Sequence, residues 1–402
     1  MRPFTDTLPF DDALRLVRGG AVPTAKTERV ALTAADGRVL AVDVRAAIDV
    51  PPFERAAMDG YAVVAADTAG ASEASPVVLR PIGRVFTGAQ ANVRVTPGTC
   101  VEIATGAPMP GGADAVVMVE QTTATDAGVR FTRAATPRQH VGARGGDIMA
   151  GHTVLEAGAV LTPARIGVLA ALGHTSIAVY ARPRVAILCT GDEVVDPGEP
   201  LGPGQLYNVN RFTLDALIRR HGGDPVAPPT TRDSMTALSE TLAHTGDCDI
   251  LVFSGGSSVG ERDLVIDALR LHGEVIFHGI AIKPGKPTVF GRIGLAPVLG
   301  LSGYPTSCLS NAHLFLVPLL RAIARLPAWT PRTVTLPLAR RITSGAGRVQ
   351  FYMVRIIDGR AEPAFKASGD ITSMAHADGY VTVPGPTEMV EAGTDVVVTL
   401  YD

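Results

Sequence analysis

Five short segments of the chain combine glycine with acidic, hydroxyl or lysine side chains, and each follows a run of residues typical of a β-strand. They are Cys189–Glu193, Thr231–Asp233, Ser254–Gly260 with Asp263 shortly after, Lys283–Pro287, and Leu301–Ser307. When parallel strands lie side by side, their carboxyl ends meet at one edge, where backbone N–H groups and helix N-termini face a ligand. We therefore expect the chemistry of this protein at that edge.

Each segment also has an ordinary structural explanation. Glycine after a strand is common turn chemistry, and Asp192 with Glu193 could belong to a solvated turn. Asp233 precedes a helical pattern and could be the N-cap of that helix. One such segment on its own therefore does not establish a binding site.

The pair Lys283 and Lys286 is harder to explain as structure alone. The sequence Lys-Pro-Gly-Lys-Pro holds two ammonium groups in a stiff turn, because proline excludes a helix there. The serine- and glycine-rich loop at 254–260 is of the kind that cradles phosphate through backbone N–H groups. Together they predict an anion site.

Acidic residues at the same edge indicate a metal ion. Glu193, Asp233 and Asp263 would repel a phosphate unless a divalent cation lay between them, and Mg²⁺ prefers such oxygen ligands. The serines of the Gly-Ser-Ser loop have no partnered histidine motif, and the nine histidines show no His-Glu-x-x-His or His-x-His spacing. We therefore expect metal-assisted phosphoryl or oxyanion transfer rather than covalent catalysis.

The elements between residues 175 and 326 would position these side chains. Alternating strands and helices are expected at 184–190, 210–222, near 224–230, 234–245, 249–255, 261–273, 274–282, 296–302 and 307–326, of which 274–282 and 296–302 are consecutive strands. Strands separated by helices of roughly 10 to 15 residues indicate a parallel sheet covered on both faces, with right-handed crossovers.

β-rich stretches on either side predict further domains. Short apolar runs between residues 46 and 141, separated by Gly, Pro and Asp clusters, indicate a small all-β domain. From Trp329 onward short strands return without helices, which predicts a terminal β-barrel or sandwich. Separate helices are expected at 8–17 and from Thr162-Pro163 to about Leu172.

Composition excludes several functional classes. At 402 residues and 46% hydrophobic content, the chain is long enough for more than one core. Its 36 basic and 39 acidic residues form no long run of like charge, which argues against binding to nucleic acid or a membrane surface. The four cysteines form no Cys-x-x-Cys pair, and neither a signal peptide nor a membrane-length apolar run occurs, so we expect a soluble cytoplasmic protein.

Six motifs occur in an order characteristic of one protein family. They are Met58–Ala62, Thr105–Ala107, Arg144–Asp147, Thr190–Glu193, Ser254–Gly260 and Lys283–Pro287. Over essentially its whole length the chain thereby resembles the molybdopterin molybdenumtransferases, the MoeA and gephyrin E-domain family. The resemblance implies a transferase of molybdenum cofactor biosynthesis that inserts molybdate into adenylylated molybdopterin, with Mg²⁺-assisted release of AMP.

The resemblance also implies a multidomain α/β plus β fold and an elongated homodimer. A doubly covered, mostly parallel α/β domain of the molybdopterin-binding type would comprise 6–26 with 175–326, and a C-terminal β-barrel domain would comprise 327–402. A linking domain would comprise 27–45 with 149–174, and a small β-rich domain 46–148. That small domain would bring Asp59, Thr105 and Asp147 to the crevice of the other subunit.

The family's functional residues carry over by position. Expected catalytic acids are Asp59, Asp147, Glu193, Asp233 and Asp263, and the last three would also hold the metal. Lys283 and Lys286 would bind molybdate or the terminal phosphate. The expected substrate-binding residues are Thr105, Gly255, Gly256, Ser257, Lys283, Lys286, Pro305, Arg348 and Ser368. Arg348 could equally be a surface residue, and Ser368 a turn former.

Some positions depart from the family pattern. Ser302 and Tyr304 replace proline and asparagine in the family's Leu-Pro-Gly-Asn-Pro turn, which predicts a looser turn with one more N–H donor. Gly146 stands where an acidic residue is common. The choice between molybdate and tungstate stays open.

Two other functions stay open beside the transferase. One is a molybdopterin adenylyltransferase, whose α/β module shares the serine-glycine loop, and the other is a non-catalytic scaffold of the gephyrin type. The lysine turn and the additional β-domains favour the molybdenumtransferase. Under that reading a separate molybdopterin adenylyltransferase is a further expected partner.

Overall fold

The computed structural model describes residues 7–228, 230, 234–255, 264–345, 347–364, 367 and 369–401. The chain forms two compact units. The larger comprises 1–28, 37–39 and 179–402, and the smaller comprises 29–36 and 40–178. The finer division into four domains stays a prediction.

A six-stranded sheet lies at the centre of the larger unit, in the order β16-β13-β17-β21-β20-β18. Its strands are β13 (Arg184–Cys189), β16 (Asp224–Val226), β17 (Ile250–Ser254), β18 (Glu274–His278), β20 (Val289–Ile293) and β21 (Ala296–Leu301). Because β20 is antiparallel to both of its neighbours and the other ladders are parallel, the remaining five strands share one direction. The expected mostly parallel sheet is confirmed.

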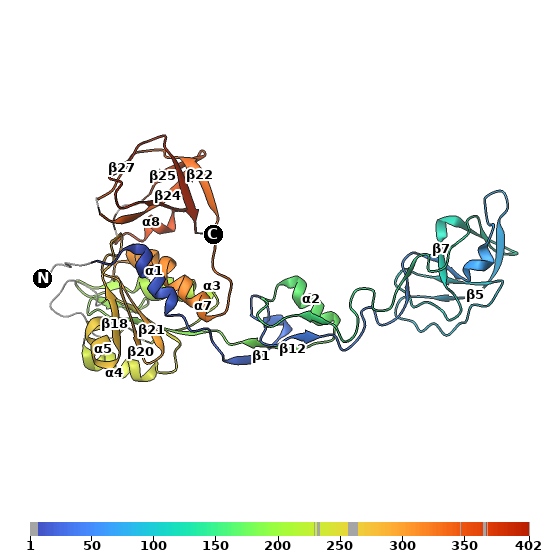
Figure 1. Cartoon of the computed structure of the whole chain (residues 1–402), viewed down its shortest axis with the longest axis horizontal. Helices are drawn as coiled ribbons and strands as arrows, with labels where there is room; N and C mark the ends of the chain where they lie inside the picture. The colour runs from blue at the N-terminus through green and yellow to red at the C-terminus, as the bar shows by residue number, and fades with distance from the viewer. Residues whose placement is uncertain are drawn as a thin grey trace. The chain divides into compact units, whose positions relative to one another are not determined.

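Helices cover both faces of this sheet because the strand side chains that point to either face are apolar. Val185 and Ile187 join one buried cluster, and Ala186 and Leu188 join another. Figure 1 shows α4 and α5 on one face and α1, α3 and α7 on the other. The helices are α1 (Phe10–Gly19), α3 (Val209–Arg220), α4 (Met235–His244), α5 (Leu264–His272), α6 (Pro305–Asn311), a π-helical turn (Ala312–Leu316) and α7 (Val317–Ile323).

One expected strand is wrong in its extent. The stretch 274–282 was predicted as a single strand, but β18 ends at His278, and Ile282–Lys283 form the separate strand β19. A left-handed glycine, Gly279 at φ +94°, ends the first strand. The antiparallel strand β20 was not predicted at all.

The C-terminal part of the larger unit is a curled sheet in the order β19-β24-β26-β28-β22, and β25 pairs with β24 in addition to this order. Its elements are β19 (Ile282–Lys283), β22 (Thr333–Pro337), β23 (Ile342–Thr343), β24 (Val349–Ile357), β25 (Arg360–Pro363), α8 (Thr372–Ala375), β26 (Gly379–Val383), β27 (Met389–Val390) and β28 (Asp395–Leu400). The helix α1 ties this sheet to the α/β part, since the Phe10 ring lies 5.7 Å from Phe315 and 5.2 Å from Phe351.

The smaller unit contains a six-stranded sheet in the order β7-β4-β6-β5-β9-β8. Its strands are β4 (Gly60–Val63), β5 (Val77–Val85), β6 (Thr99–Ile103), β7 (Ala115–Met118), β8 (Thr122–Thr125) and β9 (Gly128–Phe131), with β3 (Arg55–Ala56) paired to β10 (Val141–Gly142). Two aliphatic clusters, one around Phe131 and one around Ile103, form its cores. The predicted small β-rich fold is confirmed.

Short elements connect this sheet to the ends of the smaller unit. They are β1 (Thr27–Ala31) paired with β12 (Ser176–Tyr180), β2 (Val44–Arg45) paired with β11 (Thr153–Leu155), and α2 (Pro163–Ala171). Thr162 caps α2 by accepting a hydrogen bond from the Arg165 N–H at 3.4 Å, as the Thr-Pro pair predicted.

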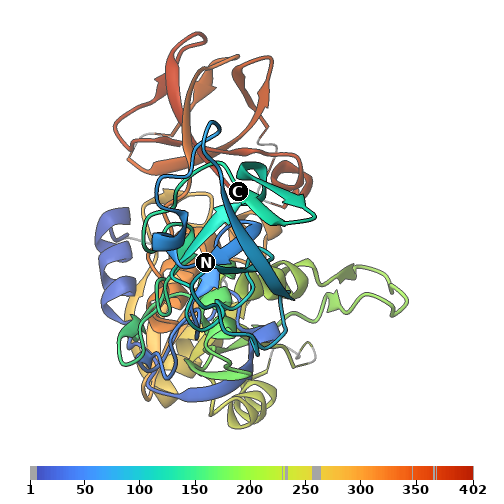
Figure 2. The same cartoon turned by 90° about the vertical axis from the view of Figure 1, so that its right-hand side faces the viewer.

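Two further features complete the description of the fold. The strands β14 (Val194–Val195) and β15 (Leu206–Tyr207) form the base of an arm, yellow-green in Figure 2, that projects away from the central sheet. No helix in the described part of the chain has the length and apolar content needed to span a membrane.

Candidate active site at the carboxyl edge of the central sheet

The carboxyl ends of three central strands lie side by side. In the ladders, Cys189 of β13 is opposite Ser254 of β17, and Ser254 is opposite Leu301 of β21. The hydrogen bonds continue past the strand ends, since the Thr190 N–H donates to the Ser254 carbonyl at 3.2 Å and the Gly255 N–H to the Leu301 carbonyl at 3.4 Å. Three of the predicted glycine-bearing turns therefore meet at one edge.

Glycine is required where these turns touch. Gly255 has φ +99°, and a Cβ built there would lie 2.4 Å from the Thr190 carbonyl oxygen. A Cβ on Gly303 would lie 3.5 Å from the Gly255 Cα. Any side chain at position 255 would therefore push apart the turns that follow β13 and β17.

A buried asparagine, which sequence analysis did not single out, holds two of the turns together. Asn210 of α3 donates from Nδ2 to the Ser254 hydroxyl and to the Gly303 carbonyl, each at 2.8 Å. Asn210 is 7% exposed and Thr190 5%. The Asn210 Oδ1 and Thr190 Oγ1 atoms are buried and have no hydrogen-bond partner within the described residues. The floor of the edge thus offers polar atoms that a ligand or water could satisfy.

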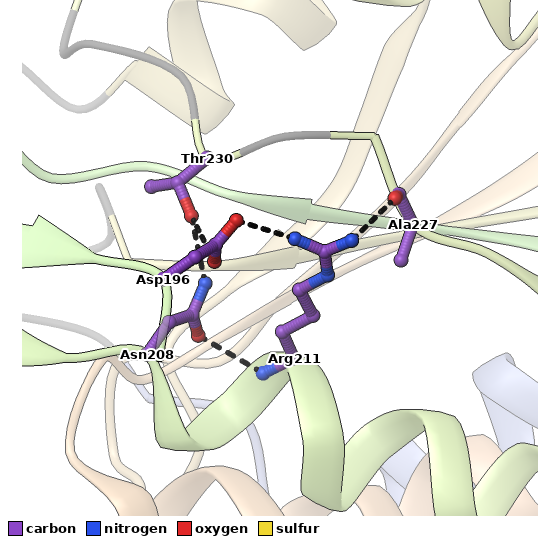
Figure 3. A network of polar contacts seen from close by, with 5 residues as sticks. All are labelled: Asp196, Asn208, Arg211, Ala227 and Thr230. Carbon is purple, nitrogen blue, oxygen red and sulfur yellow. Dashed lines mark hydrogen bonds and ion pairs between the residues drawn. The ribbon is translucent and has the colours of Figure 1, made fainter. Parts of the chain in front are cut away.

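The first turn of α3 is fixed by the network drawn in Figure 3. Asn208 caps the helix by accepting from the Arg211 N–H at 3.0 Å, and its amide donates to Thr230 at 2.9 Å. Arg211 forms a 2.5 Å ion pair with Asp196 and also donates to the Ala227 carbonyl at 3.1 Å. The network joins the segment after β13 to the segment after β16, so both are held over the N-terminus of α3.

The turn that carries Lys283 and Lys286 also lies at this edge. It connects β18 to β20, and the ladder pairs His278 with Val289 and Val289 with Gly300, next to the end of β21. Lys283 itself belongs to β19, which pairs in parallel with β24 of the C-terminal sheet, opposite Gln350. The lysine turn is thus shared between the α/β part and the C-terminal sheet.

The C-terminal sheet reaches the start of α6 by a second route. The Thr306 hydroxyl donates to the Asp370 carbonyl at 2.9 Å, and a Cβ on Gly369 would lie 3.5 Å from the ring of Tyr304. Tyr304 is 65% exposed, and its N–H donates to the Ser302 hydroxyl at 3.2 Å. Ser302 stands where the family has proline, and the absence of proline predicted a looser turn. The hydrogen bond to the Ser302 hydroxyl restrains this turn.

The other expected residues of the larger unit are placed as follows. Glu193 is exposed after β13, and a Cβ on Gly191 would lie 2.9 Å from its Oε2, so the carboxylate bends back over the strand end. Pro305 is the first residue of α6. Arg348 is exposed directly before β24. Asp233, Gly256, Ser257, Asp263 and Ser368 lie outside the described residues.

The expected residues of the smaller unit form a separate group. Asp59 precedes β4, and its Oδ1 accepts a hydrogen bond from the Thr105 N–H at 2.7 Å. The Asp147 side chain is exposed, and its N–H donates to the Val50 carbonyl at 3.0 Å. Nearby, the Ala150 N–H and the Arg144 guanidinium, which both donate to Asp49, lower the pKa of that carboxyl. Of the three expected residues in this unit, the structure brings Asp59 and Thr105 into contact.

Two buried asparagines, Asn210 and Asn311, the last residue of α6 and 0% exposed, had a detectable signal in the sequence. Asn210 shares a helix face with Leu214 and Leu217, and Asn311 shares one with Cys308 and Phe315, so each amide stands on an apolar face.

Within the described ranges, no group of three or more His, Cys, Asp or Glu side chains is placed to hold a metal ion. Two of the three expected metal ligands lie outside those ranges.

Comparison with known proteins identifies the family. Residues 8–173 match the MoeA N-terminal region (domain I and II), 186–322 the probable molybdopterin binding domain, and 335–401 the MoeA C-terminal region (domain IV). The chain is 37% identical to molybdopterin molybdenumtransferase 2 of Mycobacterium tuberculosis over 91% of its length and 93% of that relative. It is 33% identical to the molybdopterin molybdenumtransferase of a Nostoc species over 92% and 88%, respectively.

A solved structure agrees with these matches. The crystal structure of a molybdopterin biosynthesis MoeA protein from Pyrococcus horikoshii superposes with a TM-score of 0.85 at 38% identity, covering 99% of this chain and all of that one. The sequence motifs, the edge of the central sheet and these comparisons agree: the chain belongs to the molybdopterin molybdenumtransferase (MoeA) family of transferases in molybdenum cofactor biosynthesis.

Proposed function

We propose that this protein transfers molybdate to adenylylated molybdopterin and releases AMP with the help of Mg²⁺. The observation that carries the proposal is the lysine turn, which lies at the same sheet edge as the turns after β13, β17 and β21. An oxyanion bound by Lys283 and Lys286 would thus lie beside glycine-bearing turns of the kind that bind phosphate through backbone N–H groups. That juxtaposition suits a reaction between two anions.

The residues at the edge have separate roles in this proposal. Gly255 and the loop that follows it cradle the pterin phosphate, while the two lysines neutralise molybdate. Glu193, together with Asp233 and Asp263, supplies the hard oxygen donors that Mg²⁺ prefers. When bound, Mg²⁺ would neutralise charge on the adenylate phosphate as AMP leaves. Pro305, Arg348 and Ser368 would complete the anion pocket from α6 and the C-terminal sheet.

The site is proposed to be completed by a second copy of the chain. Asp59, Thr105 and Asp147 all belong to the smaller unit, and the Asp59 and Asp147 side chains are exposed and therefore available to a ligand. The contact from the Thr105 N–H orients the Asp59 carboxylate, and its second oxygen accepts no hydrogen bond from the residues that the structure describes. In the proposed homodimer these acids meet the carboxyl edge of the other subunit's sheet.

The proposal is tested by combining purified protein, Mg²⁺, molybdate and adenylylated molybdopterin. We expect AMP release that depends on molybdate, together with cofactor that activates an apo-molybdoenzyme. Lys286→Ala should reduce kcat/KM for molybdate by about 100-fold, because one charge-assisted contact contributes about 1.5–3 kcal/mol. Lys26→Ala is the matched control, since that exposed lysine pairs with Asp249 at 2.9 Å.

Two results would contradict the proposal. One is AMP release that is unaffected by molybdate and by Lys286→Ala. The other is formation of adenylylated molybdopterin from MgATP, which would identify the chain as the enzyme of the preceding activation step. Only four lysines occur in the chain, at 26, 283, 286 and 366, so protection of single amines by molybdate can be followed by mass spectrometry.

A further inference from the structure

The lysine turn is bonded to helix α6 by one fully buried side chain. Asn311, the last residue of α6, donates from Nδ2 to the Gly285 carbonyl at 3.0 Å and to the Thr288 hydroxyl at 2.6 Å. Thr288 in turn donates to the same Gly285 carbonyl at 2.8 Å. Asn311 and Thr288 are both 0% exposed. The three groups form a closed hydrogen-bonded triangle between the helix and the turn.

The turn can approach this amide only because residue 285 is glycine. Gly285 has φ +93°, and a Cβ there would lie 2.0 Å from the Asn311 Nδ2. The carbonyl of Gly285 can only accept, so the amide must present Nδ2 to it, which fixes the orientation of the side chain. Lys283 and Lys286 therefore flank Gly285, whose carbonyl is bonded to α6 through Asn311.

The buried Asn311 amide lowers the stability of the core in a way that an apolar side chain would not. The Asn311 Oδ1 is buried and has no hydrogen-bond partner within the described part of the chain. An unsatisfied buried acceptor lowers stability, whereas an apolar side chain at the same place would carry no such cost. The amide is thus better explained by the bonds it makes to the turn than by the stability of the core.

The helix geometry changes directly after Asn311. The π-helical turn Ala312–Leu316 begins at the next residue, and it adds a residue to the turn relative to an α-helix. This shifts the direction of the side chains by roughly 100° between α6 and α7. Asn311 can thus face the lysine turn while Phe315, Leu316 and Leu319 stay in the core.

We propose that Asn311 is a positioning residue for the oxyanion: it holds the Lys283–Pro287 turn so that both ammonium groups face one bound molybdate. The proposal rests on the proposed function, because molybdate is the anion assigned to these lysines. A turn that is already fixed loses less conformational entropy when it binds, so its affinity is higher at the same contacts. Asn311 touches no reacting atom and acts only through the turn.

The test compares Asn311→Ala and Asn311→Ser in the full-length protein. Asn311→Ala should raise the Kd and KM for molybdate about tenfold, equal to about 1.4 kcal/mol, because Gly285 and Thr288 lose their hydrogen bonds from α6. The kcat at saturating molybdate and the Kd for AMP should stay within about twofold. Asn311→Ser keeps one donor and should recover most of the molybdate affinity.

A buried hydroxyl away from the expected site residues provides the control for lost stability. Thr68, which is 0% exposed, donates to the Ala65 carbonyl and accepts from the Ala135 N–H, each at 2.8 Å, so Thr68→Ala also removes two hydrogen bonds of a buried side chain. It should lower the melting temperature without raising the Kd for molybdate. An equal rise in that Kd in both variants would overturn the proposal.

Failure of the positioning role and failure of the proposed function give different results. If wild type binds molybdate, Lys286→Ala does not, and Asn311→Ala binds it as wild type does, only the positioning role is wrong. If wild type fails to bind molybdate, or Lys286→Ala binds it equally well, the assignment of the oxyanion site is wrong, and with it the role of Asn311.

Discussion

Single polar side chains decide the shape of the candidate site. The amides of Asn210 and Asn311 are almost completely buried, and each bonds a helix to a turn at the carboxyl edge of the central sheet. In each case the amide oxygen is left without a partner among the described residues. Buried polar groups with unmet hydrogen bonds often mark functional positions, since stability alone disfavours them.

A buried histidine makes the stability of the larger unit depend on pH. His221 is 5% exposed and lies near Arg321 and Arg220, and burial followed by these charges lowers its pKa from 6.5 to about 4. The unfolded chain therefore binds a proton between about pH 6.5 and pH 4 that the folded chain does not. Stability is fully present above that window and decreases as the pH falls through it, by about 3 kcal/mol in total.

The measurement is the free energy of urea unfolding from pH 7 to pH 4. The fluorescence of Trp329 is a suitable local probe, because this single tryptophan lies 5.4 Å from the His221 ring. His221→Phe should flatten the pH dependence. His152→Phe, at an exposed position of the smaller unit, controls for the substitution itself. Identical slopes in the two variants would show that His221 does not carry the effect.

At the scale of elements, helix termini fix the segments at the carboxyl edge of the central sheet. Asn208, at the N-terminus of α3, is 3% exposed and both caps the helix and bonds Thr230 (Figure 3). Its neighbour Arg211 pairs with Asp196. The start of one helix therefore restrains two loops that come from different strands.

Asn208→Ala should lower the free energy of unfolding of the larger unit by about 1–2 kcal/mol, through loss of the cap and of the bond to Thr230. Thr213→Ala, one turn further along the same helix, removes only a 3.2 Å bond to the Asn210 carbonyl. It should change stability by less than about 0.5 kcal/mol, since alanine favours the helix. Urea unfolding followed by Trp329 fluorescence compares them, and equal losses would argue against the capping role.

At the scale of the whole molecule, the expected site residues are divided between the two compact units. Asp59, Thr105 and Asp147 belong to the smaller unit, whereas Glu193, Lys283 and Lys286 belong to the larger. Each unit has its own buried cores. If a homodimer shares its sites as proposed, one chain supplies only part of each.

Complementation between inactive variants tests this sharing. Asp59→Asn and Lys286→Ala, refolded together in equal amounts, should recover about a quarter of wild-type activity, because half of the dimers are mixed and each has one intact site. The pair Lys283→Ala with Lys286→Ala should not complement, as both residues belong to the same unit. Absence of recovery in the first mixture, with mixed dimers present, would contradict the shared site.

The sequence by itself determined the family, the β-rich and α/β regions and the strand ends where chemistry was expected. These depend on local patterns, such as the apolar runs of β13 and β17 or the prolines around Lys283, which act over a few residues. Local patterns did not predict β20 or the end of β18 at His278. Nor could they indicate that Lys283 pairs with Gln350, because that ladder joins segments far apart in the chain.

Only the tertiary structure decided which buried groups face the turns. Asn311 was one polar residue on an apolar helix face until folding placed it against Gly285, and Asn210 likewise until the ends of β17 and β21 came together. Hydrogen bonds of this kind depend on distances between residues remote in sequence, and no periodicity encodes such distances. The chemistry of the lysine turn was thus predictable from its residues, whereas its support had to be seen in three dimensions.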